Sequence, residues 1–456
     1  MAALKQLLAR ARAWLSGATT RPRADYLSPG LYHYQRQQAG ERSRIHLRID
    51  PDQNGLLLVN ASRVMHLNPS AAFMARLALY ETPAPQAISK LTRRFQVTKR
   101  QAETDYAQFC DQLEQVIRPD GLCPLHDLDL DVIPPFSAHP AAPYRMDLAL
   151  TYRCNNDCAH CYNARPRDYP ELSTAEWMSI IDRLWQIGIP HLVFTGGEPT
   201  LRPDLPELIQ HAQKTGMVAG LNTNGRRLGD TRFIQELVEA GLDHVQITLE
   251  SHDQHIHDAM VGRGGAWQQT VAGIRNALDS PLYVMTNTTM LHHNAPVMEQ
   301  TLAFLAEMGV PTVGLNALIY AGSGANCGAG LEEKQLKPLL DMARRSTSAN
   351  GQRLIWYTPT QYCHFDPMDL ELGVKGCTAA LYNMCIEPDG AVIPCQSYYQ
   401  ALGFLLKDSW ESIWNHELAL NLRQRHYISQ DCQDCVLLSE CGGGCPLYKH
   451  PVDHKQ

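Results

Sequence analysis

The sequence lacks an excess of positive charge. Its 456 residues include 40 Lys and Arg against 47 Asp and Glu, which gives a formal net charge of -7 at pH 7. A chain with this balance has no global basic field to attract nucleic acid or an anionic membrane. We therefore expect no nucleic acid and no membrane among its partners, and only a local patch could change that expectation.

The sequence also lacks a long hydrophobic run in its opening segment, MAALKQLLARARAWLSG. Apolar residues there follow helical spacing, but Lys5, Arg10 and Arg12 interrupt any stretch long enough for a secretory core or a membrane span. We expect a cytoplasmic protein with an N-terminal extension over residues 1–40. Because 456 residues exceed one ordinary compact domain, two or three domains should follow this extension.

Cysteine, in contrast, is abundant, with fourteen residues in the chain. Without an export signal, such a set more often binds metal than forms disulfides. One group, CNNDCAHC, has the spacing C-x3-C-x2-C through Cys154, Cys158 and Cys161, with no fourth thiol nearby. A structural zinc site needs four protein ligands. A [4Fe-4S] cluster held by three thiolates instead leaves one iron free for a substrate or cofactor, so we expect a cluster here.

Residues 144–355 alternate six apolar runs of strand length with amphipathic helices, one of which begins with a capping box from Ser173 to Glu176. This alternation predicts an α/β fold with a parallel sheet wound as a partial (β/α)6 barrel. Catalytic groups of such sheets lie at the carboxyl ends of the strands. The cysteines follow the first run, and the next three runs are followed by TGGEP (195–199), NTNG (222–225) and TLES (248–251).

The three cysteines together with TGGEP resemble the radical S-adenosylmethionine (radical SAM) enzymes. The resemblance implies that Cys154, Cys158 and Cys161 hold the cluster. Its free iron binds S-adenosylmethionine, and reductive cleavage gives a 5'-deoxyadenosyl radical that abstracts hydrogen. Gly196 and Gly197 let the backbone come close, and Glu198 accepts the methionine ammonium. The looser cofactor-binding matches are Thr223, Asn224, Ser251 and His160.

Two alternatives qualify these looser matches. Thr223, Asn224 and Ser251 could equally serve plain packing at the strand ends. His160 stands where the family often has an aromatic residue, and its planar imidazole is expected to lie against adenine. No catalytic acid, base or hydrogen donor can be assigned beyond the cluster ligands.

Residues 356–456 carry the second cysteine group, with the spacing C-x12-G-x4-C followed by C-x2-C-x5-C-x3-C. This pattern resembles the SPASM extension, which holds auxiliary iron–sulfur clusters, while a zinc ribbon remains the alternative. The resemblance implies that the first auxiliary cluster is held by Cys377, Cys385, Cys395 and Cys445. It assigns the second to Cys432, Cys435 and Cys441, and the family's further cysteine is not found after Cys445.

The fourth position of the second auxiliary cluster therefore stays open. The candidates are His450, Asp453, His454 and the distant Cys363, and the iron could also lack a fourth ligand. The cysteines outside both groups are most simply buried small hydrophobes, and these are Cys110, Cys123, Cys327 and Cys363. The glycine-rich YAGSGANCGAG (320–330) is either a mobile loop over the site or an ordinary surface loop.

Residues 41–118 predict three short strands followed by three helices, a winged-helix-like unit whose commonest use is DNA binding. Asn68 caps the first helix and Pro69 begins it. This unit also resembles the peptide chaperone of pyrroloquinoline quinone biosynthesis, a RiPP recognition element that binds a leader peptide as an added strand. A proline-rich linker is expected at residues 119–143.

The sequence thus predicts a maturase for a ribosomally made precursor peptide, with the leader on residues 41–118. The product could be a thioether, a carbon–carbon or aryl crosslink, or an epimerised residue, and a flavodoxin or ferredoxin would supply electrons. The same chemistry on a small molecule, in tetrapyrrole or redox-cofactor biosynthesis, is one alternative. A non-catalytic iron–sulfur regulator that binds DNA is another, although such a sensor needs no TGGEP methionine pocket.

Overall fold

The computed structural model describes residues 26–38, 41–60, 63–117, 140–163 and 165–448. Several predictions of the sequence concern residues outside these ranges, namely most of the N-terminal extension and of the linker, and Cys123, His450, Asp453 and His454. Among the described residues, no helix combines the length and apolar character needed to cross a membrane.

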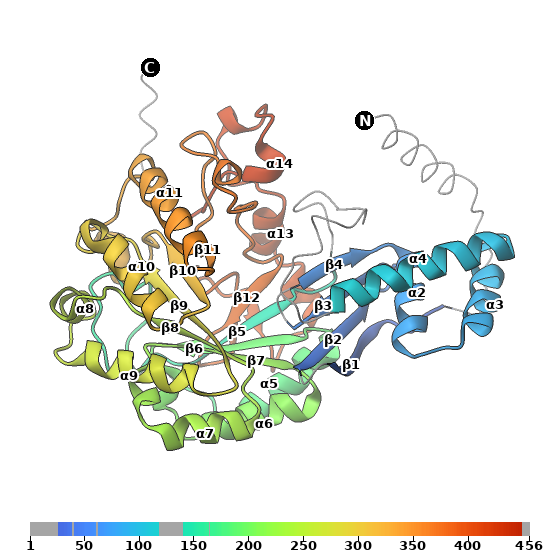
Figure 1. The fold of residues 1–456 in the computed structure, drawn as a ribbon, viewed down its shortest axis with the longest axis horizontal. Coiled ribbons are helices and arrows are strands. Elements are labelled where there is room, and N and C mark those ends of the chain that lie inside the picture. Colours follow the sequence, from blue (N-terminus) through green and yellow to red (C-terminus); the bar gives the residue numbers. More distant parts are fainter. Residues whose placement is uncertain (1–25, 39–40, 61–62, 118–139, 164, 449–456) are drawn as a thin grey trace.

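An N-terminal domain forms a lobe beside the barrel (Figure 1). Its antiparallel sheet has the order β1 (Gly30–Gln38), β2 (Glu41–Ile49), β3 (Gly55–Val59), β4 (Arg63–Leu67). Its helices are α2 (Pro69–Leu79), α3 (Ala84–Phe95) and α4 (Lys99–Ile117). The sequence predicted three strands and placed β1 within the extension of residues 1–40. The strand GLYHYQRQQ carries mostly polar residues at the edge of the sheet, and therefore lacks a clear apolar alternation.

The predicted helix signals of this domain are confirmed. The Asn68 side chain accepts a hydrogen bond from the Ala71 backbone N–H at 2.9 Å, and Pro69 occupies the first turn, where a missing N–H costs nothing. The helical spacing of the apolar residues in α4 predicts that they share one face, and the structure buries all of them, namely Ala102, Tyr106, Phe109, Leu113 and Val116. Helical periodicity therefore located the core side of α4 correctly.

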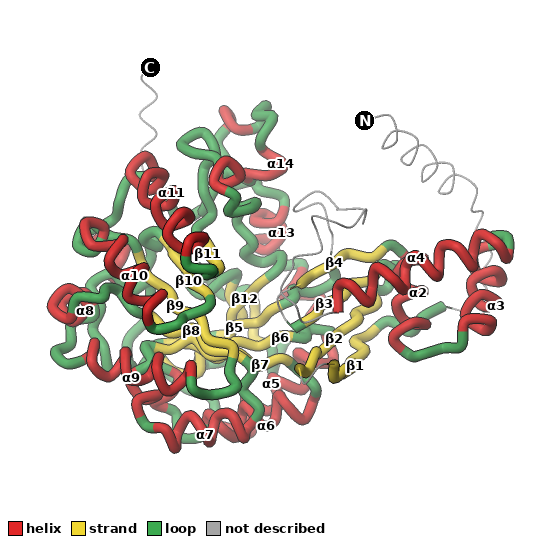
Figure 2. The backbone as a smooth tube through the Cα atoms, viewed as in Figure 1, coloured by secondary structure: helices red, strands yellow, loops and turns green. Residues whose placement is uncertain are grey.

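The central domain confirms the partial barrel. Its parallel strands are β5 (Arg145–Thr151), β6 (His191–Gly196), β7 (Val218–Thr223), β8 (His244–Thr248), β9 (Tyr283–Thr289), β10 (Thr312–Asn316) and β11 (Arg353–Trp356). The helices between them cover one face of the curved sheet (Figure 2), and they are α5 (Thr174–Ile187), α6 (Leu205–Thr215), α7 (Thr231–Ala240), α8 (Gln254–Met260), α9 (Ala266–Leu278), α10 (Met298–Glu307) and α11 (Glu333–Ala349). Strand β11 follows the sixth β/α repeat.

The C-terminal region continues the same sheet. Strand β12 (Asn383–Ile386) pairs in parallel with β5, and the antiparallel strands β13 (Ala391–Ile393) and β14 (Gly403–Phe404) follow. The remaining helices are α12 (Trp410–Trp414), α13 (Glu417–Arg423) and α14 (Leu438–Cys441). The cysteine-rich region is thus attached to the barrel through a shared strand pairing rather than through a linker.

Alternation along β5 separates the core from the barrel interior. Met146, Leu148 and Leu150 are fully buried with the helices, beside the large side chain of Trp177. Their neighbour Asp147 points to the other face, since successive side chains of a strand face opposite sides. The predicted capping box begins α5 in the structure, so the first β/α unit is set by local sequence.

Strand β2 has two different buried faces. Its apolar side chains enter the core of the N-terminal domain, and they are Ile45, Leu47 and Ile49. Its polar side chains face the barrel: Arg44 donates to the Met217 carbonyl at 2.6 Å and His46 to the Gly216 carbonyl at 2.8 Å. The Arg48 guanidinium donates to the Ala142 carbonyl, just before β5, at 3.0 Å and forms an ion pair with Asp50 at 2.9 Å. These buried polar contacts fix the domain against the barrel.

Two histidines held neutral by desolvation predict a loss of stability in mild acid. Burial lowers the pKa of His46 to about 3, and the partial burial of His244 lowers its pKa to about 4. The unfolded chain takes up these protons near pH 6.5, whereas the folded chain cannot, so stability falls as the pH drops from 6.5 towards 4. At pH 5 we expect about 2 kcal/mol less unfolding free energy per histidine than at pH 7.5.

Urea unfolding of the cluster-free chain at pH 7.5, 6 and 5 measures this effect. The variant His244→Gln should show a shallower dependence on pH, while the exposed His293, replaced in the same way, should leave it unchanged. Equal pH dependence in all three proteins would show that the buried imidazoles do not cause the acid sensitivity.

Candidate functional site

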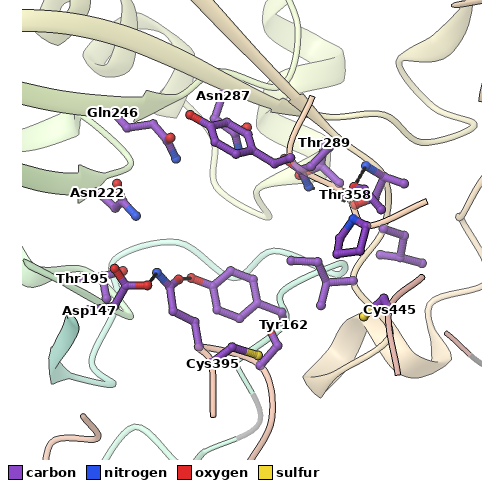
Figure 3. A pocket seen from close by; sticks show the side chains of 18 of the residues that line it. Asp147, Tyr162, Thr195, Asn222, Gln246, Asn287, Thr289, Thr358, Cys395 and Cys445 are labelled. Atoms are coloured by element: carbon purple, nitrogen blue, oxygen red, sulfur yellow. Dashed lines mark hydrogen bonds between the residues drawn. The ribbon is translucent and has the colours of Figure 1, made fainter. Parts of the chain in front are cut away.

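A cavity of about 630 Å3 lies inside the barrel, within the usual size range of ligand sites. The strands β5 to β10 line it with polar side chains, namely Asp147, Thr195, Asn222, Gln246, Asn287 and Asn316. Figure 3 shows several of them facing a common space. The first cysteine group and residues of the C-terminal region also line the cavity.

The three-cysteine loop (residues 152–163) follows β5, and Cys154, Cys158 and Cys161 all line the cavity. Burial, helped by the neighbouring Glu198 and Cys161, raises the pKa of Cys154 to about 11. Burial and the other two thiols also raise the pKa of Cys158. The free thiols are therefore neutral at pH 7, and metal binding must release their protons.

Guanidinium groups hold the three-cysteine loop through its carbonyls. Arg167 donates to the carbonyls of Cys154 at 2.6 Å and Asn156 at 2.7 Å. Arg226 donates to the Asn155 carbonyl at 2.5 Å. These contacts fix the backbone between the cysteines, and the charge of Arg167 opposes the rise in the pKa of Cys154.

The donor set fits an iron–sulfur cluster better than a single ion. Every described cysteine is a free thiol. Within the described ranges, no three His, Cys, Asp or Glu side chains converge as ligands of one metal ion. A cluster differs because each thiolate binds its own iron. Three thiols spread along one cavity wall therefore match a [4Fe-4S] cluster with one iron open to the cavity.

The two glycines of TGGEP bring β6 against the three-cysteine loop. A Cβ on Gly196 would lie 2.2 Å from the Thr151 carbonyl oxygen, and one on Gly197 would lie 2.5 Å from the Arg153 carbonyl oxygen. The Gly197 N–H donates to Thr151 O at 2.7 Å, in a contact that a side chain would disrupt. The sequence predicted that these glycines let the backbone come close to a neighbour, and in the structure that neighbour is the loop that carries the three cysteines.

Glu198 is fully buried and joins the ends of β6 and β7. Its Oε1 accepts from the hydroxyls of Thr200 at 2.6 Å and Thr223 at 2.7 Å, and its Oε2 accepts from the Asn224 N–H at 2.8 Å. Burial raises the pKa of Glu198, and these hydrogen bonds act against the rise. Oε2 keeps acceptor capacity for a cation such as an ammonium group.

The structure brings only some of the looser predicted residues to the cavity. Thr223 and Asn224 line it, and the Asn224 side chain donates to the Asn155 side chain at 2.6 Å. Ser251 is fully buried, accepts a hydrogen bond from the Asp253 N–H at 3.1 Å and is absent from the cavity lining. Its position therefore matches the packing alternative that the sequence left open.

His160 lines the cavity, and sequence reasoning missed its partner. His160 Nε2 lies 2.9 Å from Glu250 Oε1, and Glu250 is itself buried. Burial alone would lower the pKa of His160, but the carboxylate outweighs it and the pKa is raised. Glu250 immediately precedes Ser251 in the quoted TLES, so the structure brings a neighbouring member of this motif to the cavity.

The second cysteine group divides into two sites. Cys377, Cys395 and Cys445 line the cavity, and the latter two raise the pKa of Cys377 beyond the effect of burial. Cys385 lies beside Cys395 but is buried in an apolar cluster rather than in the cavity lining. The others, Cys432, Cys435 and Cys441, lie outside the cavity.

A hydrogen-bond chain across the cavity was not predicted from the sequence. The Tyr162 hydroxyl donates to the Gln396 side chain at 2.7 Å, and Gln396 Nε2 donates to Asp147 at 2.5 Å (Figure 3). It links the three-cysteine loop, the C-terminal region and β5. The glycine-rich segment 320–330, for which the sequence left open a loop over the site or an ordinary surface loop, contacts the three-cysteine loop, since the Gly324 N–H donates to the Cys161 carbonyl at 3.1 Å.

Comparison with known proteins agrees with this geometry. Residues 148–317 match the Radical SAM superfamily, and residues 377–436 match SPASM, an iron-sulfur cluster-binding domain. SuiB from Streptococcus suis, bound to the precursor peptide SuiA, is similar over 88% of this chain and 94% of its own, with a TM-score of 0.66 and 15% identity. SuiB bound to S-adenosylmethionine gives a TM-score of 0.66 at 14% identity, covering 90% and 98%.

A second protein, native anSMEcpe with bound AdoMet, covers 66% of this chain and 89% of its own, with a TM-score of 0.55 and 18% identity. At these identities the likeness concerns the fold. The two SuiB structures extend over the N-terminal part of the chain as well as over the barrel and the C-terminal region, as their coverage requires.

Proposed function

Because this chain is a radical SAM enzyme with a C-terminal SPASM domain, we propose that it modifies a ribosomally synthesised precursor peptide by hydrogen abstraction. When bound, its [4Fe-4S] cluster and S-adenosylmethionine supply the 5'-deoxyadenosyl radical. Cys154, Cys158 and Cys161 would hold this cluster, and auxiliary clusters would occupy the C-terminal cysteines. We include in this proposal a product that is a thioether, a carbon–carbon or aryl crosslink, or an epimerised residue. We also include a flavodoxin or ferredoxin as the electron donor and a cytoplasmic location.

The observation that carries the proposal is the contact between the N-terminal domain and the cavity. Leu58 of β3 and Val64 of β4 line the same cavity as the three cysteines. The Tyr144 hydroxyl lies 2.7 Å from His66 Nε2 of β4, and the Tyr144 ring stacks on Tyr382 at 4.6 Å. A peptide held by this domain would reach the cavity without crossing bulk solvent.

Strand β4 offers an edge suited to a peptide strand. It ends the sheet order, and no further strand among the described residues pairs with its outer side. Arg63 donates to the Val116 carbonyl at 2.5 Å, which ties the end of α4 to the start of β4. A sheet edge beside a helix is the setting in which leader peptides add as a strand.

The chemistry of the cavity also suits a peptide. Asn222, Gln246 and Asn287 present amide side chains, whose donors and acceptors match those of a peptide backbone. Asn287 Oδ1 is buried without a hydrogen-bond partner in the described structure, so a substrate N–H could donate a hydrogen bond to it. SuiB with SuiA and anSMEcpe with Kp18Cys peptide are two similar folds that hold peptides.

The test is anaerobic turnover with candidate peptides encoded beside the gene. The reconstituted chain receives S-adenosylmethionine and a reductant, and 5'-deoxyadenosine is quantified with and without each peptide. Stimulated 5'-deoxyadenosine production together with the loss of two hydrogens from the peptide would establish crosslinking. Incorporation of deuterium from the solvent into a peptide of otherwise unchanged elemental composition would establish epimerisation. Failure of every peptide, combined with tight and salt-sensitive binding of labelled DNA, would favour the regulator instead.

Leader docking at β4 makes a separate prediction. The variant Val64→Glu places a charge on the cavity wall and should weaken binding of a labelled precursor peptide by at least about tenfold, or about 1.4 kcal/mol. Peptide-free cleavage of S-adenosylmethionine should stay unchanged. Val97→Glu is the control, because Val97 is also partly buried in this domain but lies outside the cavity lining. Equal weakening in both variants would point to general damage.

A further inference from the structure

The segment around residues 360–364 packs directly on the last cysteines of the second group. The Tyr362 N–H donates to Cys441 Sγ at 3.4 Å, and Cys441 Sγ lies 3.6 Å from the Thr360 carbonyl. The Gln361 side chain donates to the Gly443 carbonyl at 3.3 Å. Two segments far apart in the sequence therefore meet at Cys441, and Cys363 lies on the segment that arrives.

Cys363 directly follows Tyr362, whose backbone N–H donates to Cys441 Sγ at 3.4 Å, so the chain places Cys363 beside the second auxiliary site. Partial burial raises the pKa of Cys363, and the electrostatic effects of Cys441 and, more weakly, of Cys432 act in the same direction, in keeping with this position. Cys363 is exposed, contrary to the sequence expectation of a buried small hydrophobe. An exposed thiol beside two others has no packing role to account for it.

Other side chains beside this site are less suited to the fourth position. His364 follows Cys363 directly, but its Nδ1 is paired with Glu333. Cys377, Cys395 and Cys445 are grouped at the cavity instead. Within the described ranges, Cys363 is the cysteine outside both predicted groups that lies on the segment contacting Cys441.

We propose that Cys363 is the fourth thiolate of the second auxiliary cluster, completing a set with Cys432, Cys435 and Cys441. Four thiolates satisfy every iron of a [4Fe-4S] cluster. The cluster would then have no iron free for a substrate, in contrast to the one at Cys154. It would also join the strand β11 side of the barrel to the C-terminal helices, because Cys363 and Cys441 belong to these separate regions.

Alkylation of the unaltered full-length chain tests the assignment without a mutation. In the cluster-free chain the exposed Cys363 should react readily with iodoacetamide, as should the exposed Cys435. After anaerobic reconstitution, mass spectrometry should find both protected by at least about tenfold, because a metal-bound thiolate is masked. Cys110 of α4 serves as the control and should react equally in both states. Continued reactivity of Cys363 in a chain whose Cys435 is protected would overturn the proposal.

Variants give an independent measurement that does not depend on activity. Relative to the parent chain and to Cys110→Ala, the variant Cys363→Ala should lose between about one and about four iron atoms per chain, since the cluster either sheds its unligated iron or fails to form. Mössbauer and EPR spectra should change for one auxiliary cluster only. Cys363→Ser should retain more iron with an altered spectrum. Unchanged iron and spectra in Cys363→Ala would refute the assignment, and if that variant lost every cluster, the alkylation result would decide.

Discussion

Replacement of Cys158 by alanine is expected to abolish reductive cleavage of S-adenosylmethionine, lowering 5'-deoxyadenosine production far beyond 100-fold. Loss of a residue that merely supports a metal ligand already costs about 10- to 100-fold, so loss of a ligand itself should cost more. Cys158 lies between the other two cysteines in the sequence of the three-cysteine loop, and all three are half-buried in the cavity wall.

The measurement combines product quantification with EPR of the reduced cluster. Both signals should vanish in Cys158→Ala while the auxiliary clusters remain. Cys327→Ala is a matched control, since Cys327 is a cysteine of the glycine-rich loop that packs near the three-cysteine loop. It should keep its cluster and its turnover. Full turnover in Cys158→Ala would mean that the cluster is held elsewhere.

A single methyl group on Gly197 is expected to have the second largest effect. The added Cβ would lie 2.5 Å from the Arg153 carbonyl and 2.6 Å from the Tyr152 carbonyl, and both contacts are backbone atoms that cannot rotate away. Overpacking of this kind costs about 1–3 kcal/mol of stability. A displacement of the three-cysteine loop by about 1 Å should reduce turnover by about 100-fold. The effect is steric, since Gly197 does not adopt a positive φ.

Thermal unfolding and 5'-deoxyadenosine production measure the two parts of this prediction. Gly264→Ala is the control, because a Cβ there meets no atom within 4 Å and its φ is also not positive. That variant should match the parent protein in both assays. Parent-like turnover in Gly197→Ala would show that TGGEP can move away without disturbing the loop, which would remove its inferred role.

Local sequence patterns predicted the barrel well. The six β/α repeats, the capping box at Ser173 and the buried face of α4 all depend on residues a few positions apart. Such patterns survive folding because they describe one element at a time. The strand β1 escaped because an edge strand with polar side chains shows no apolar alternation.

Contacts between distant segments could not be predicted in the same way. Gln396 and Asp147 are separated by 249 positions along the chain but share a hydrogen bond. Nothing in either local sequence indicates the other, because their approach depends on β12 pairing with β5. The approach of Cys363 to Cys441 likewise joins segments that are far apart in the sequence.

The position of Glu250 in the cavity lining follows from the alternation of side chains along β8 and beyond its end. Gln246, Thr248 and Glu250 line the cavity, whereas Val245, Ile247 and Leu249 are buried on the other side. Since strand side chains alternate between faces, the even-numbered residues continue the polar series into TLES. Strand parity therefore selects Glu250 as the cavity residue and assigns Ser251 to packing.

The polar face of strand β2 would help to determine which residue of a bound peptide reaches the reaction site. Because Arg44, His46 and Arg48 lock the N-terminal domain onto the barrel, the span from the β4 edge to the three cysteines is constant. Under the proposed function, this constant span would fix the distance between the bound leader and the reacting residue. The number of residues between leader and reaction site, rather than the side chains around that site, would then select which position is altered.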